Sequence, residues 1–116
     1  MATSPDAHMD KILEAMNRGA GKAHFSDDAK KRLHDRYAYW LDFPVASEGH
    51  KTPRGVWKDQ EAHFLERLTK IGETAANTAG GGEISAQIAM ASVQSVEADS
   101  QCPYCLVKNP DANPPG

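Results

Sequence analysis

Apolar residues recur at three- and four-residue steps along four stretches of the chain, and this spacing predicts four amphipathic helices. Glycine and proline residues separate the stretches, which places the helices near residues 5–18, 27–42, 53–78 and 83–100. No stretch alternates convincingly with the period of a strand, and no internal repeat is visible. The pattern therefore predicts an all-α protein, a four-helix bundle-like small domain with an irregular, proline-rich C-terminal tail. The stripes comprise Met9, Ile12, Leu13 and Met16; Ala29, Leu33, Tyr37, Trp40 and Leu41; Trp57, Phe64, Leu65, Leu68, Ile71 and Ala75; and two lines on the last helix, Ile84, Ile88 and Ala91 beside Ala86, Met90 and Val93.

The punctuating residues set the expected boundaries of these helices. Gly19-Ala20-Gly21 should end the first helix, and Thr52-Pro53 should open the third. Gly72 lies inside the third helix, where glycine costs about 1 kcal/mol relative to alanine. Gly80-Gly81-Gly82 breaks the chain before the fourth helix and is interpreted as a hinge. We expect one helical domain over residues 1–100, with residues 101–116 carrying a CxxC motif and the tail.

Length and charge narrow the function classes. The chain has 116 residues and a net charge of −3, so it fits one small domain and shows no basic footprint for nucleic acid. No apolar run approaches the roughly 18–20 residues of a membrane span, and the first residues lack the apolar segment of a secretory signal. We therefore expect a cytoplasmic protein with no nucleic-acid or membrane partner. Residues 1–75 hold 12 basic and 12 acidic residues, so the whole net charge belongs to residues 76–116.

Cys102-Pro103-Tyr104-Cys105 is the strongest candidate for chemistry. Two cysteines separated by two residues can close a small disulfide, and the proline presets the first turn of a helix. Because a helix N-terminus stabilises a thiolate, Cys102 is the candidate attacking thiol and Cys105 the resolving thiol. The same pair is also half of a tetrahedral zinc site.

The stretch ISAQIAMASVQSVEADSQCPYC, residues 84–105, resembles the core of the alkylhydroperoxidase-like, carboxymuconolactone decarboxylase-like family. In that family a helix of small residues leads into a CxxC that opens the next helix. The resemblance implies a small, all-α, cytoplasmic and oligomeric protein. It also implies that Cys102 and Cys105 are the catalytic pair of a thiol-dependent, peroxidase-like oxidoreductase, which reduces peroxide or relays electrons to a partner protein without a bound cofactor.

A second hypothesis is a non-enzymatic helical accessory or oligomerisation subunit. Asn109 stands where the family usually carries a histidine, and Met90-Ala91 where it carries an acidic residue. Residues 83–100 would then contact a second copy or another protein, because their small side chains allow close approach. The cysteines would be structural, or Cys102 and Cys105 would contribute half of a zinc site shared with a second chain.

Other polar residues give weaker signals for a site. A di-iron centre in a helical bundle uses Glu-x-x-His, whereas the residues three positions after Glu61 and Glu66 are Phe64 and Thr69. His63 is therefore expected at the surface or at the boundary of the core. Gly80-Gly81-Gly82 lacks both the preceding strand and the following lysine of a nucleotide-binding loop.

Aromatic residues are concentrated in the second and third predicted helices and should form the core between them. Tyr39 lies off the apolar stripe and should be exposed. His34, Asp35 and Arg36 are expected on a solvated face. The aromatic set comprises Tyr37, Tyr39, Trp40, Phe43, Trp57 and Phe64.

Overall fold

The computed structural model describes residues 7–98 and Tyr104, and the chain is all-α, as the periodicity predicts. Four α-helices carry the fold, together with two short strands and one turn of 3-10 helix. In chain order the elements are α1 (Ala7–Ala20), β1 (His24–Phe25), α2 (Asp27–Leu41), η1 (Ala46–Glu48), α3 (Trp57–Ala79), β2 (Glu83–Ile84) and α4 (Ala86–Ala98).

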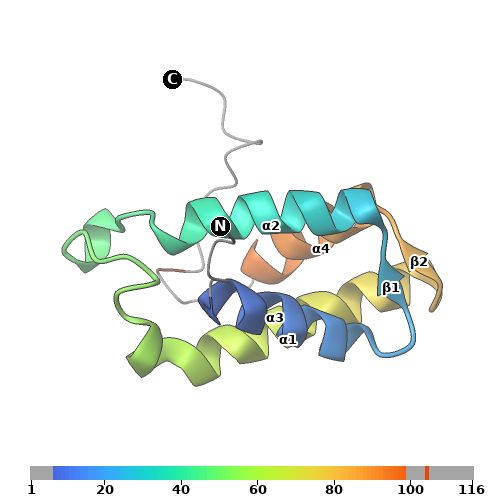
Figure 1. Cartoon of the computed structure of the whole chain (residues 1–116), viewed down its shortest axis with the longest axis horizontal. Coiled ribbons are helices and arrows are strands. Elements are labelled where there is room, and N and C mark those ends of the chain that lie inside the picture. Colours follow the sequence, from blue (N-terminus) through green and yellow to red (C-terminus); the bar gives the residue numbers. More distant parts are fainter. Residues whose placement is uncertain (1–6, 99–103, 105–116) are drawn as a thin grey trace, which may run out of the picture.

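The helices form two layers, with α1 beside α3 in one and α2 beside α4 in the other (Figure 1). Lys11 contacts Glu61 and Met16 lies against Gly72, so α1 and α3 run in the same direction. After α1 and after α3 the chain turns, and the next helix, α2 or α4, runs back along the bundle. The closest packing is between α1 and α3, while α4 fills the space against both α3 and α2.

β1 and β2 pair in parallel at one end of the bundle, with His24 opposite Glu83 and Phe25 opposite Ile84. After each strand a serine caps the next helix. Ser26 Oγ accepts a hydrogen bond from the main-chain N–H of Ala29 at 3.1 Å, and Ser85 Oγ accepts one from that of Ile88 at 3.2 Å. The fold therefore repeats a helix–strand–serine–helix unit. Sequence patterns missed it because two-residue strands are too short to show alternation.

Two helices begin later than predicted, one because of a local turn and one because of strand pairing. Residues 53–56 form a turn in which the N–H of Gly55 donates to Thr52 Oγ at 3.0 Å, so α3 begins at Trp57 rather than at Thr52-Pro53. Glu83 and Ile84 pair as β2, so α4 begins at Ala86. The predicted break at Gly80 is confirmed, since its φ of 71° closes α3. The predicted start of the first helix lies partly outside the described residues.

The first helix ends within the Gly19-Ala20-Gly21 segment, as expected, and Gly19 also has a role in helix packing. α1 continues to Ala20, and Gly21, at a φ of 63°, follows its end. A Cβ at Gly19 would lie 2.0 Å from the carbonyl oxygen of Thr69, and one at Gly72 would lie 2.1 Å from that of Met16. Both glycines therefore allow the backbones of α1 and α3 to approach closely. Gly72 lowers the helix propensity of α3, and in exchange it permits this close contact.

The core lies between the two layers and contains most of the predicted stripes. The aromatic residues of α2 and α3 are largely buried, and Tyr39 is 41% exposed, as expected. Both lines predicted for residues 83–100 contribute to the core: Ile84 is fully buried, and Ala86 and Ile88 are half-buried. Met90 and Val93 face the core with Ala89 and Val96, whereas Ala91 is exposed.

Candidate functional site

Cys102 and Cys105, the candidate thiols, lie outside the described residues, but Tyr104 between them is described. Tyr104 is 5% exposed and belongs to the hydrophobic core. The indole N–H of Trp40 donates a hydrogen bond to its main-chain carbonyl oxygen at 2.8 Å. The ring of Tyr104 meets that of Phe64 edge to face, with centroids 6.2 Å apart. Tyr104, the described residue of the CPYC motif, is thus anchored to α2 and α3.

The anchor belongs to a cluster of aromatic rings between α2 and α3. Trp40 and Phe64 pack edge to face with centroids 5.0 Å apart, and Tyr37 meets Trp40 in the same way at 5.6 Å. Trp57 also packs against Phe64, with ring centroids 5.4 Å apart. Tyr104 adds a ring from the C-terminal part of the chain, so the predicted α2–α3 aromatic core is confirmed and is larger than expected.

A buried ion pair joins α2 to the last turn of α4. Arg36 is only 1% exposed, and its Nη2 donates to both carboxylate oxygens of Glu97, whose side chain is 17% exposed. The guanidinium also lies 5.3 Å from the ring centre of Tyr37. The expectation that Arg36 shares the solvated face of His34 and Asp35 is wrong.

The position of Arg36 could have been inferred from spacing alone. It follows Leu33 by three residues and precedes Trp40 by four, so it lies inside the apolar stripe of α2. Glu97 likewise follows Val93 by four. An arginine and a carboxylate that each continue an apolar stripe are a signal for a buried pair.

Burial sets the protonation behaviour of this pair. Loss of solvent raises the pKa of Glu97, and this effect outweighs the attraction of Arg36 and Arg67, which favours the charged carboxylate. Burial alone would lower the pKa of Arg36, but Tyr37 and Glu97 together raise it, so the guanidinium stays charged.

His63 and Arg67 lie one turn apart on α3, beside Phe64. Arg67 Nη2 donates to the main-chain carbonyl oxygen of Val96 at the end of α4. His63 Nε2 and Arg67 Nε are buried atoms with no hydrogen-bond partner among the described residues. His63 is half-buried, which agrees with its expected place at the core boundary, but sequence gave no sign of the buried nitrogen.

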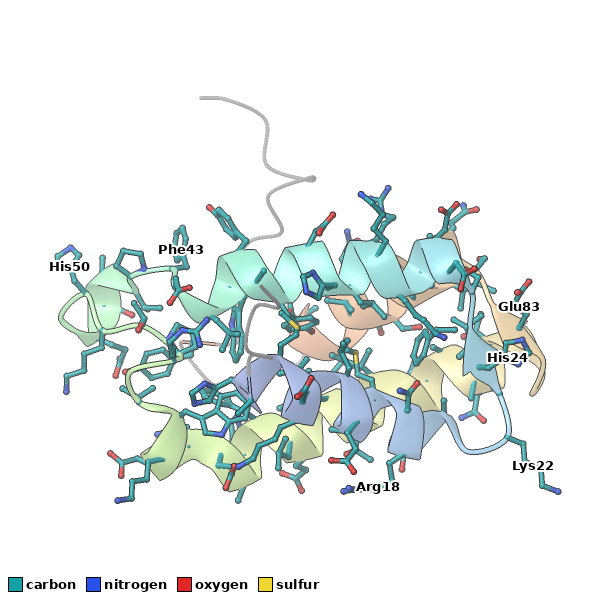
Figure 2. All side chains as sticks on the ribbon, viewed as in Figure 1. Arg18, Lys22, His24, Phe43, His50 and Glu83 are labelled. Atoms are coloured by element: carbon teal, nitrogen blue, oxygen red, sulfur yellow. The ribbon has the colours of Figure 1, made fainter. Side chains whose placement is uncertain are left out.

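Figure 2 shows His24 and Glu83 together at the strand end of the bundle, far from Phe43 and His50 at the other end. His24 Nε2 lies 4.0 Å from Glu83 Oε2, with both side chains about two-thirds exposed. Because water screens the charges of such an exposed pair, the pair contributes little to stability. Within residues 7–98 and Tyr104, no group of three or more histidine, cysteine or acidic side chains is placed to hold a metal ion.

The outer side of α4 forms an open depression with α2. Its volume is about 530 Å³, and its lining is Arg32, Ala86, Gln87, Met90, Ala91 and Gln94. The α4 side of this surface carries no charge, because α4 has no ionisable residue before Glu97. This face coincides with much of the segment expected to contact a partner.

No family model, curated protein or solved structure matches this chain. In the part of the chain that the structure describes, none of the helices combines the length and apolar character needed to cross a membrane.

Proposed function

We propose that this chain is a cytoplasmic thiol–disulfide redox protein in which a helical domain presents the Cys102–Cys105 dithiol. The observation that carries the proposal is the burial of Tyr104, which Trp40 and Phe64 hold in the core. Consecutive Cα atoms are about 3.8 Å apart, so a fixed Tyr104 limits how far either cysteine can lie from α2 and α3. A CxxC in a free tail would have no such restraint.

The proposed reaction is thiol–disulfide exchange with a disulfide substrate. The Cys102 thiolate attacks one sulfur of the substrate, forms a mixed disulfide and displaces the other substrate sulfur as a thiolate. Cys105 then attacks Cys102 Sγ, which closes the Cys102–Cys105 disulfide and releases the second substrate thiolate. Two electrons pass from the dithiol to the substrate, and the thiolates take up protons from water.

Peroxide is the oxidant that the family resemblance favours. The Cys102 thiolate would then attack one peroxide oxygen, break the O–O bond and release an alcohol or water, leaving a sulfenic acid. Cys105 would condense with that sulfenic acid, releasing water and forming the same disulfide.

The test is a count of free thiols and bound zinc on freshly purified full-length protein, repeated after mild oxidation. The proposal expects two thiols and no zinc before oxidation, and a disulfide that dithiothreitol reverses afterwards. Cys102→Ser and Cys105→Ser should each abolish the intramolecular disulfide. Stoichiometric zinc that is lost in Cys102→Ser would contradict redox chemistry and favour the shared zinc site.

A second candidate is a non-enzymatic accessory or oligomerisation subunit, and the depression whose α4 side carries no charge favours it. The proposed occupant is a second copy of this chain, bound through residues 83–100, with the cysteines structural or forming half of a shared zinc site. Stable interfaces usually bury more than about 1,000 Å², which would require more of α2 than Arg32 alone.

Size-exclusion chromatography with light scattering distinguishes this candidate. A dimer that Ala91→Arg converts to a monomer, while Ala62→Arg on the exposed side of α3 does not, supports the subunit hypothesis. A wild-type protein that stays monomeric at high micromolar concentration contradicts it.

A further inference from the structure

A second open depression lies between α1 and α2, next to β1. These two helices belong to different layers of the bundle (Figure 1), and α1 packs far more closely against α3 than against α2. The helices therefore leave a space of about 220 Å³ between their facing side chains. Its lining comprises Leu13, Met16 and Asn17 of α1, Phe25 of β1, and Lys30 and Leu33 of α2.

The floor of this depression is apolar and its rim is polar. Met16, Phe25 and Leu33 belong to the hydrophobic core and are at most 4% exposed. Asn17 and Lys30 are exposed, one on each helix. A ligand bound here therefore places an apolar body against the core and a polar group at the rim, as in most small-molecule sites.

The charge at the rim is positive. Of the described residues that line the depression, only Lys30 is charged, and it forms no ion pair with any residue that the structure describes. Acidic residues occur on both helices, namely Asp27 and Asp28 in the first turn of α2 and Glu14 on α1, whose carboxylate lies 3.7 Å from Arg18. None of these acidic residues lines the depression. Charge complementarity therefore favours a ligand whose polar group is an anion.

We propose that this depression binds a small monocarboxylate with an apolar body of about six to nine carbon atoms. An apolar cavity of about 150 Å³ is large enough for benzene, whereas drug-sized ligands occupy pockets of about 300 Å³ or more. A space of about 220 Å³ lies between these two sizes. The carboxylate accepts hydrogen bonds from Lys30 Nζ and the side-chain amide of Asn17. The site uses neither cysteine, so it goes beyond the proposed redox function and does not depend on it.

The methionine methyl groups report on this site. Met16 lines the depression between α1 and α2, Met90 lines the one between α2 and α4, and Met9 lines neither. The test is NMR spectroscopy of full-length protein with carbon-13 methyl-labelled methionine, titrated separately with hexanoate and 3-phenylpropionate. We expect at least one acid to shift the Met16 signal and saturate it with a Kd of about 1 mM. The signals of Met9 and Met90 should stay in place.

Lys30→Gln tests whether the charge recognises the ligand. We expect this variant to bind the acid about fivefold more weakly, the upper range for an exposed ion pair. Lys31→Gln is the matched control, because Lys31 is the next residue along α2, lies 3.5 Å from Asp35 and does not line the depression. Its affinity should stay within about twofold of the wild type. The uncharged amide of the same acid should bind the wild type about fivefold more weakly than the acid does.

The proposal is overturned if neither acid shifts Met16 saturably below about 20 mM, or if Met9, Met16 and Met90 shift alike. It is also overturned if Lys30→Gln and Lys31→Gln bind the acid equally well, because the anion is then not recognised. Circular dichroism checks that both variants keep the helices, which is expected because both lysines are exposed. Thiol counts after mild oxidation test the redox function separately, so each proposal can fail without the other.

Discussion

The indole N–H of Trp40 donates to the main-chain carbonyl oxygen of Tyr104, a residue 64 positions later in the chain. Both residues are at most 5% exposed, so the hydrogen bond is shielded from water. A buried carbonyl that loses its donor costs about 1–3 kcal/mol, because water does not replace the bond. This contact therefore links the stability of the helical domain to the position of Tyr104.

Replacing Trp40 by phenylalanine should lower the stability of the helical domain and weaken the hold on Tyr104. The ring is kept in part, but the donor to Tyr104 is lost and a small cavity remains, so we expect a destabilisation of about 2–3 kcal/mol. Urea denaturation monitored by circular dichroism measures this. Cys105 should also be alkylated faster in native buffer, because its neighbour Tyr104 is held less firmly.

Trp57→Phe is the matched control for that variant. Trp57 is also buried, but its indole N–H donates to Glu61, a carboxylate at the surface that also pairs with Lys11. We expect a smaller loss of stability and no change in the alkylation of Cys105. Equal effects of the two substitutions on Cys105 would show that the Trp40–Tyr104 bond does not position the motif.

Periodicity predicted the helices because each one buries a single apolar face. Tyr37, Trp40 and Phe64 recur at helical spacing, and all three lie in the predicted aromatic core. The candidate thiols, predicted from local spacing alone, lie outside the described residues and stay a prediction. Local sequence was sufficient wherever the determining interaction lies within one turn.

The remaining features depend on contacts between segments far apart in the chain. The spacing of Arg36 from Leu33 and Trp40 indicates burial, but its ion-pair partner Glu97 lies on another helix and is not visible locally. The close approach of Gly19 to Thr69 on α3 is likewise not visible locally. The buried nitrogen of His63 depends in the same way on packing around α3.

Arg36→Met tests how much the buried ion pair between Arg36 and Glu97 contributes to the free energy of unfolding. Removing one partner of a buried pair typically costs about 3–5 kcal/mol, since the other is left without compensation. Arg67 still attracts Glu97, so we expect the lower end, about 3 kcal/mol, in urea denaturation. The double variant Arg36→Met/Glu97→Met should be more stable than the single one.

Arg54→Met provides the comparison at the surface. Arg54 and Asp42 form an ion pair at 2.9 Å, with side chains 34% and 63% exposed. Exposed pairs contribute about 1 kcal/mol or less. If Arg36→Met costs no more than Arg54→Met, the buried pair contributes nothing beyond an exposed one.

Glu97→Gln should change how stability depends on pH. Burial raises the pKa of Glu97, so the folded state binds this proton more tightly than the unfolded state. Its contribution to stability is complete below the unfolded pKa of about 4.3 and is lost as pH rises through the folded pKa. Glutamine cannot titrate, so the stability of Glu97→Gln relative to the wild type should rise between pH 4 and pH 8.

Urea denaturation at several pH values measures that difference. Arg36 stays charged throughout this range, because its pKa is raised above its ordinary value, and it adds no pH dependence of its own. A relative stability that falls with pH would mean that the attraction of Arg36 outweighs burial and that the pKa of Glu97 is lowered.

Gly72→Ala should destabilise the protein although alanine is the better helix former. The substitution gains about 1 kcal/mol in helix propensity. The new Cβ would lie 2.1 Å from the carbonyl oxygen of Met16 and 2.9 Å from the N–H nitrogen of Ala20, both in the backbone of α1. Backbone atoms cannot rotate away, so α1 and α3 must separate, and we expect a net loss of about 2 kcal/mol in thermal or urea denaturation.

Gly82→Ala tests whether the effect comes from this close approach. At Gly82 the nearest atom to a new Cβ is 3.9 Å away, and its φ is not positive, so alanine fits there without strain. Its stability should stay within about 0.5 kcal/mol of the wild type or rise slightly, because alanine restricts the unfolded chain. Gly19→Ala should behave like Gly72→Ala, since its Cβ would lie 2.0 Å from the oxygen of Thr69. If Gly19→Ala and Gly72→Ala were as stable as Gly82→Ala, the α1–α3 contact would not require glycine at these positions. The low helix propensity of the two glycines would then have no structural benefit.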